Sequence, residues 1–306
     1  MRSILPLLSF LVGLLLVTMA LRSAVRTFVL PRSAADPLAR LLFLVMRRIF
    51  DLWTIRANTY LERDRAMALY APVSLLMLLP VWLVVVLLGF MGMFWSVGVR
   101  PWRSAFILSG SSLLTLGYAP VQDLPATILS LTEATIGLLL VALLIAYLPA
   151  IYTAFSRREA AVAMLEVRAG SPPSALVLIE RSHRIGRLHR LGELWITWEL
   201  WFADIEESHT SLAALPFFRS PHPDRSWITA AGAVLDAAAL VASTVDIQYD
   251  TQADLCIRAG YVALRSIADF FSISHNPDPH YPEDPISITR DEFNDACDEL
   301  ARQGVP

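Results

Sequence analysis

The chain has 306 residues, of which 55% are hydrophobic and 17% are charged, and its mean hydropathy is +0.52. This composition excludes an ordinary soluble domain and indicates a membrane protein that carries a soluble part. The net charge of −3 says little about partners, and no nucleic-acid partner is expected.

The first apolar run, Ser3 to Leu21, carries no charge and is 19 residues long, close to the roughly 20 that a helix needs to cross a bilayer. A cleaved signal peptide is the alternative, because Arg2 precedes the run and small residues near its end form an acceptable cleavage site. The density of arginines after the run marks a cytoplasmic segment and favours an uncleaved anchor with its N-terminus outside. These arginines are Arg22, Arg26, Arg32, Arg40, Arg47, Arg48, Arg56, Arg63 and Arg65.

A second helix is predicted to start at Asp36-Pro37, a pair typical of an N-cap followed by the first helical position. Apolar residues then recur at helical spacing, with charged residues on the opposite face. This pattern fits an amphipathic helix at the cytoplasmic interface or a helix packed on the soluble domain. The apolar positions are Leu38, Leu41, Leu42, Val45, Ile49, Leu52 and Trp53, and the charged ones are Arg40, Arg47 and Asp51. We assign residues 1–65 to the anchor and this helix.

An uncharged run from Val73 to Val97 predicts the second membrane helix. Trp82 and Trp95 are expected to anchor it at the membrane interfaces. Arg100 and Arg103 then mark a short external turn.

A serine-rich segment from Trp102 to about Leu114 follows, and it is too short to cross the membrane. Its position between two apolar runs predicts a re-entrant helix. It leads into Thr115-Leu116-Gly117-Tyr118-Ala119, which matches T-V-G-Y-G at four of five positions when Leu116 is counted for valine. The segment therefore resembles the pore loop of tetrameric potassium channels, and the resemblance covers roughly residues 73 to 158.

In that family the backbone carbonyls of four such loops replace the hydration shell of the ion, so the resemblance implies a homotetramer surrounded by membrane lipids. It implies no cofactor other than potassium as the permeant ion. It also implies a selectivity filter made of Thr115, Leu116, Gly117, Tyr118 and Ala119, and a pore helix that carries Ser111 and Ser112.

The filter departs from the family at three positions. Ala119 replaces the second glycine, and its Cβ opposes a left-handed backbone by about 1–2 kcal/mol. Pro120 stands where the family has aspartate and favours extended backbone at Ala119. Ser111 stands where many members have glutamate behind the filter. We expect a displaced outer carbonyl ring and a lower selectivity for potassium over sodium than a complete filter gives.

The third membrane helix is predicted from Ala134 to Phe155, with Arg157 and Arg158 at its cytoplasmic end. Residues 66–158 then form the pore domain. Pro149 removes one backbone hydrogen bond, so it either bends this inner helix at a gate or ends it a few residues later.

Glu133 lies at the outer end of the same helix and is interpreted as an outer-mouth residue or as a partner for Arg100 or Arg103. The distribution of arginines predicts a multi-pass protein of the cell (inner) membrane. Its N-terminus is expected outside, residues 22–65 inside, and the C-terminus in the cytoplasm.

Residues 159–274 are predicted to form a cytoplasmic helical domain after a break at Gly170-Ser171-Pro172-Pro173. One long helix is expected from Ala175 to Glu207. Its arginines recur at every third position, and we interpret them as a basic face near anionic lipid or as partners for its glutamates, not as a voltage sensor. These arginines are Arg181, Arg184, Arg187 and Arg190.

The same helix carries Glu180-x-x-His183 and Glu206-x-x-His209, a spacing that two-iron bundles use. In a straight helix the two pairs would lie roughly 40 Å apart, so no shared metal site is expected. Its aromatic cluster is interpreted as core packing. The cluster comprises Trp195, Trp198, Trp201 and Phe202.

Two further helices are predicted, Trp227 to Val245 and Thr251 to Phe271. Asp236 in the middle of the first favours a buried helix of a soluble bundle over a membrane helix. Residues 275–306 form a linker, from Asn276 to Pro285, and a last helix that Thr289 and Glu292 open as a capping box. Cys256 and Cys297 fit no metal or redox pattern and are expected to be free, buried thiols.

No nucleotide-binding loop, nucleophile elbow or catalytic triad is present in the sequence, so we predict no enzyme. The predicted fold class is an all-α membrane protein with a soluble helical C-terminal bundle. Our main hypothesis is a cation channel, for potassium, with a modified filter. The alternative is a non-conducting membrane scaffold or regulatory protein with a degenerate pore loop. Under either hypothesis the cytoplasmic bundle is available to an unknown ligand or protein.

Overall fold

The computed structural model describes residues 4–30, 36–55, 59–121, 123–220, 222–276, 280 and 288–306, and within these ranges the chain is helical with no strand. Its contacts divide it into two compact units, Met1–Tyr152 and Thr153–Pro306. The long helix α6, Leu124–Ala169, belongs to both. The predicted all-α fold class is therefore confirmed.

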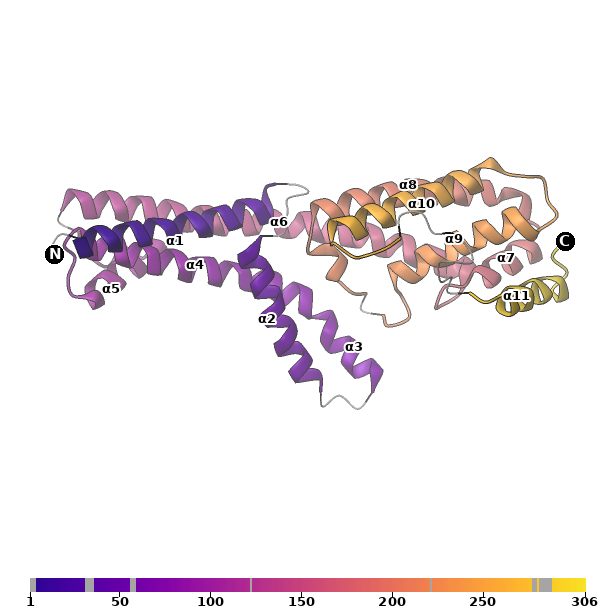
Figure 1. Cartoon of the computed structure of the whole chain (residues 1–306), viewed down its shortest axis with the longest axis horizontal. Coiled ribbons are helices and arrows are strands. Elements are labelled where there is room, and N and C mark those ends of the chain that lie inside the picture. Colours follow the sequence, from indigo (N-terminus) through magenta and orange to yellow (C-terminus); the bar gives the residue numbers. More distant parts are fainter. Residues whose placement is uncertain are drawn as a thin grey trace. The chain divides into compact units, whose positions relative to one another are not determined.

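The first unit is built around two long apolar helices, α1 (Ile4–Phe28) and α4 (Tyr70–Ser96), which pack along their length (Figure 1). They approach closely because Gly13 and Gly89 face each other; a Cβ on Gly13 would lie 2.3 Å from the carbonyl oxygen of Gly89. The helices of this unit are α1 Ile4–Phe28, α2 Pro37–Thr54, α3 Tyr60–Ala68, α4 Tyr70–Ser96, α5 Trp102–Leu113 and the first part of α6.

Among the described residues, four helical segments are long and apolar enough to cross a membrane: Ile4–Phe28, Glu62–Ser96 (most of α3 together with α4), Leu124–Ala169 and Trp227–Thr244. The first three contain the predicted membrane spans, apart from Ser3, which lies outside the described residues, and Val97, which caps α4. The chain thus has the helices of a multi-pass membrane protein. The fourth is considered below with the second unit.

The helix α6 runs without a break through Pro149 to Ala169. The alternative in which it ends shortly after Pro149 is therefore wrong. A proline removes only one hydrogen bond, and a helix that is held by packing on both sides of it can continue. The break predicted at Gly170-Ser171-Pro172-Pro173 is confirmed, because α6 ends at Ala169 and Gly170 follows it with a positive φ of 83°.

Trp82 does not anchor the membrane interface as expected. It is fully buried, and its indole N–H donates to Ser23 Oγ at 2.9 Å. Ser23 in turn donates to the carboxylate of Asp36 at 2.6 Å. The tryptophan therefore ties α4 to α1 and to the start of α2 within the core of the unit.

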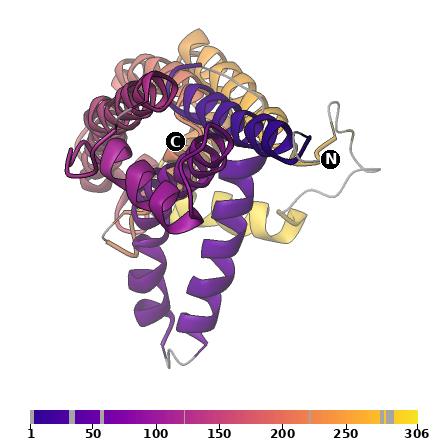
Figure 2. The same ribbon diagram turned by 90° about the vertical axis from the view of Figure 1, so that its left-hand side faces the viewer.

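The predicted cap of α2 is confirmed, because the Asp36 carboxylate accepts from the N–H groups of Leu38 and Ala39. In Figure 2, α2 and α3 lie side by side as a hairpin. One side of α2 packs on α4, where the Tyr70 hydroxyl donates to the Phe43 carbonyl at 3.0 Å. Its remaining apolar side chains are exposed: Leu41, Leu44, Val45, Ile49, Leu52 and Trp53.

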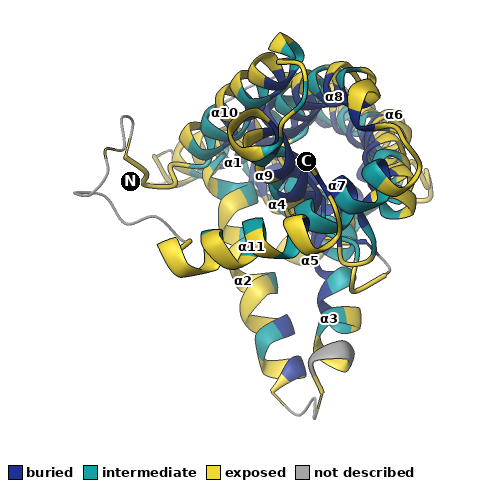
Figure 3. Ribbon diagram, turned by 90° about the vertical axis from the view of Figure 1, so that its right-hand side faces the viewer, coloured by how far each residue is buried: buried dark blue, intermediate teal, exposed yellow. Residues whose placement is uncertain are grey.

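The second unit is a helical bundle around one apolar core, which Figure 3 shows in dark blue. The predicted aromatic cluster is part of this core, with Trp195 and Phe202 fully buried. Cys256 is buried there too and Cys297 is half-buried, both as free thiols. The elements are the end of α6, α7 Ala175–Arg184, η1 Leu188–Arg190, α8 Leu191–Ser211, η2 Leu215–Phe217, α9 Trp227–Thr244, α10 Thr251–Phe270 and α11 Arg290–Arg302.

The helix α9 is apolar enough for a membrane span, yet it supplies the core of this bundle. Its valines and five of its seven alanines are buried against the neighbouring helices, whereas Asp236 lies on the exposed face. The prediction of a buried bundle helix agrees with this packing. The predicted capping box at Thr289 and Glu292 is confirmed, with both of its hydrogen bonds present. The linker before it falls almost entirely outside the described residues.

The single helix predicted from Ala175 to Glu207 is wrong, because the chain forms α7 and α8 with a turn between them. Gly186 has a φ of 66°, which a glycine adopts without strain. Its N–H donates to His183 O and the N–H of Arg187 donates to Ser182 O, which closes the end of α7.

Candidate functional site

The predicted re-entrant segment forms α5, a helix of 12 residues that packs against α4. Its buried face carries Ser109, Ser111 and Ser112. The end of α5 touches α6 at Gly137, where an added Cβ would lie 2.2 Å from the carbonyl oxygen of Leu113. Because Gly137 has no side chain, the end of α5 can approach α6 this closely.

The loop after α5 is held by one residue, Ser111. The backbone N–H groups of Leu116 and Gly117 donate to its carbonyl oxygen at 2.8 and 3.4 Å. Those of Tyr118 and Ala119 donate to its hydroxyl at 3.1 and 3.2 Å. Four consecutive amides of the loop are thus directed back towards α5.

This arrangement fixes the direction of the loop carbonyls. In a planar trans peptide the C=O points opposite to the N–H of the next residue. The carbonyls from Thr115 to Tyr118 consequently point away from Ser111. Within the described chain they accept no hydrogen bond. The loop therefore presents four free carbonyl oxygens, the type of ligand that binds a dehydrated cation.

The loop backbone is not uniformly extended. Thr115 and Gly117 have φ values of 54° and 68°. The glycine adopts this conformation freely, whereas the β-branched threonine is strained there by about 1–2 kcal/mol. Ala119 is not in the left-handed region, so the strain lies at Thr115 and not at Ala119. The side chains of Leu116 and Tyr118 are exposed.

Glu133 does not sit at an outer mouth, and no arginine of the described chain pairs with it. It is fully buried, and its Oε1 lies 2.5 Å from Ser109 Oγ, which also contacts the Leu87 carbonyl at 3.1 Å. The hydroxyl groups of Ser112 and Ser130 form a second hydrogen bond between α5 and α6, with the two oxygens 2.6 Å apart. The oxygen Oε2 of Glu133 has no partner among the described residues. These polar groups join α4, α5 and α6 behind the loop.

The most buried cation of the second unit is Arg158, whose exposed fraction is 1%. Its guanidinium donates to the carbonyls of Leu215 and Phe218, at 3.3 and 2.7 Å, and pairs with Glu159 at 3.2 Å. His209 Nε2 lies 3.3 Å from the same group. The sequence pattern identified Arg158 only as a charge at the end of a membrane helix, and it missed this role.

His209 belongs to one of the two Glu-x-x-His pairs, but it faces Arg158 and the Trp227 ring instead of a glutamate. Burial and the neighbouring positive charge of Arg158 lower the pKa of His209 to about 3. Among the described residues no group of three or more His, Cys, Asp or Glu side chains is placed to hold a metal ion.

We predict an acid-sensitive stability for this bundle. Between pH 6.5 and about 3 the unfolded chain binds a proton at His209 and the folded chain does not, so stability falls as pH falls. At pH 5 the loss from this residue is about 2 kcal/mol. Hydrogen exchange of α8 in the detergent-purified chain measures it, and His209→Gln should remove that part of the pH dependence. His183→Gln is the control; if both variants keep the same slope, the assignment is wrong.

The structure thus brings the amides of Leu116, Gly117, Tyr118 and Ala119 onto Ser111, and the amide of Thr115 donates to the carbonyl of Ser112. Pro149 lies far along α6 with its side chain exposed. No family model matches this chain, and neither a curated protein nor a solved structure matches it.

Proposed function

We propose that the first unit forms a cation channel, selective for potassium with reduced discrimination against sodium, by assembly of four identical chains. The observation that carries this proposal is the direction of the loop carbonyls from Thr115 to Tyr118. The N–H groups of the same peptide bonds donate to Ser111. The carbonyl oxygens therefore point to the opposite side of the loop, where they are available to a cation. A single loop contacts an ion from one side only. Four copies around a common axis are therefore needed to surround the ion.

The order of helices supports the same proposal. A membrane-length α4, a short α5 and a membrane-length α6 follow one another, and α5 ends where the loop begins. In the proposed topology the turn at Arg100 lies outside the cell and the second unit lies in the cytoplasm. The exposed apolar face of α2 would rest on the cytoplasmic surface of the bilayer.

A second candidate is a membrane scaffold that does not conduct and whose cytoplasmic bundle binds a partner. The left-handed backbone of Thr115 favours it, because a continuous row of carbonyls along the axis requires a more regular loop.

The two candidates are separated by cation flux in liposomes. We expect the purified protein to dissipate a potassium gradient across the liposome membrane, and we expect a pore blocker to inhibit this flux. In native mass spectrometry the protein should have the mass of four chains. Flux of sodium should be measurable but slower. Monomers or dimers alone, or tetramers without flux, would contradict the channel proposal, and tetramers without flux would favour the scaffold.

A further inference from the structure

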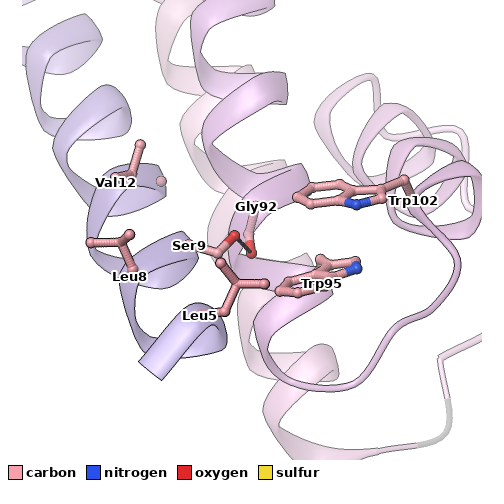
Figure 4. A pocket seen from close by; sticks show the side chains of 8 residues that line it. Leu5, Leu8, Ser9, Val12, Gly92, Trp95 and Trp102 are labelled. Carbon is pink, nitrogen blue, oxygen red and sulfur yellow. Dashed lines mark hydrogen bonds between the residues drawn. The ribbon is translucent and has the colours of Figure 1, made fainter. Parts of the chain in front are cut away.

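The first unit contains a lateral groove of about 330 Å³ at one end of α1 and α4. In Figure 4, Leu5 of α1 lies next to the Trp95 ring, and Leu8 and Val12 line the groove from the following turns of α1. Its volume falls within the range of small-molecule sites, roughly 300–1,000 Å³. Leu5, Leu8 and Val12 are about half exposed, so the groove opens to the surroundings of the helices.

The shape of the groove follows from small and large residues on neighbouring turns. Gly13 and Gly89 hold the two helices close together on one side. One turn closer to the N-terminal end of α1, Ser9 Oγ donates to the Gly92 carbonyl at 2.9 Å, and these two residues form the floor of the groove. Trp95 and Trp102 then stack, with ring centroids 4.9 Å apart, and form a rigid wall.

The open end of this wall carries positive charge. The guanidinium of Arg100 lies 4.6 Å from the centroid of the Trp95 ring. Arg103 follows Trp102 on the first turn of α5 and is exposed. Within the described chain neither arginine pairs with a carboxylate. An apolar groove beside two arginines without acidic partners is complementary to an amphiphile with an apolar chain and a negative head.

We propose that this groove binds one acyl chain of an anionic phospholipid whose phosphate contacts Arg100 and Arg103. Tryptophan is enriched at the depth where the chain of a lipid meets its headgroup, so the stacked pair suits that boundary. Arginine binds phosphate through two parallel N–H groups, and basic residues near a membrane surface favour anionic over zwitterionic lipids. The site does not depend on whether the chain conducts ions.

The test is native mass spectrometry of the delipidated full-length protein, titrated with phosphatidylglycerol or with phosphatidylcholine of the same acyl chains. We expect the first phosphatidylglycerol to bind roughly tenfold more tightly than the first phosphatidylcholine. Arg100→Gln with Arg103→Gln should abolish the difference, and Leu8→Trp, which fills the groove, should weaken binding of both lipids.

Arg168→Gln with Arg258→Gln is the matched control, since it removes the same charge from exposed positions of the second unit. It should leave the lipid preference unchanged. Equal affinity for the two lipids in the unmodified protein, or the same preference in the Arg100 and Arg103 double variant, would overturn the proposal. So would a change of oligomeric mass in Leu8→Trp without any change in lipid binding, because a second copy would then occupy the groove.

Discussion

Replacing Arg158 with methionine is expected to destabilise the second unit by about 3 kcal/mol, although methionine keeps most of the apolar stem. The change leaves the carbonyls of Leu215 and Phe218 without their donor and leaves Glu159 without its buried partner. Each buried polar group that loses its partner costs about 1–3 kcal/mol. Hydrogen exchange of α8 and α9 in the detergent-purified chain measures the loss.

The neighbouring residue provides the control. Arg157 pairs with Asp204, but its side chain is 61% exposed, so Arg157→Met is expected to cost less than 1 kcal/mol. Both variants remove one positive charge from the same turn of α6. Similar losses in the two variants would mean that burial of Arg158 is not what stabilises the bundle.

Features with a local chemical cause could be predicted from the sequence. Asp36 before Pro37, Thr289 three residues before Glu292, and Gly170 with the prolines after it each end or begin a helix through contacts within one turn. Such contacts do not depend on the rest of the fold. Long uncharged runs also predicted the membrane-length helices, because length and hydropathy suffice for that inference.

Features that depend on tertiary packing could not be predicted. Arg157 and Arg158 are adjacent and chemically identical, yet one is exposed and the other is buried among carbonyls of a distant segment. Nothing in the sequence distinguishes Glu133 from a surface carboxylate, and the packing of α4 and α5 against α6 buries it. The helical pattern around Gly186 did not predict a break, since a single glycine is often tolerated inside a helix.

The candidate loop was located from its sequence, but the role of Ser111 was not. Comparison with potassium channels suggested only that a glutamate is missing there. The structure gives Ser111 a different task, because its carbonyl and its hydroxyl together accept four loop amides. The signal available in the sequence was a hydroxyl in the last turn of α5, where it can reach N–H groups of the following loop.

The largest functional effect is expected for Ser111→Ala, and this prediction rests on the proposed channel function. The variant loses the hydroxyl that holds the amides of Tyr118 and Ala119, so their peptide groups are free to rotate. Because all four subunits carry the change, we expect potassium flux to fall at least tenfold. Native mass spectrometry should still give tetramers, since the hydroxyl contacts the loop of its own chain.

Ser104→Ala is the matched control for Ser111→Ala, because Ser104 lies on the first turn of the same helix and makes no side-chain hydrogen bond within the described chain. Its flux should equal that of the unmodified protein. Leu116 and Gly117 keep their bonds to the Ser111 backbone in both variants, so the inner part of the loop is retained. If Ser111→Ala tetramers conduct as well as Ser104→Ala tetramers, the carbonyls of the outer loop do not line the path of the ion.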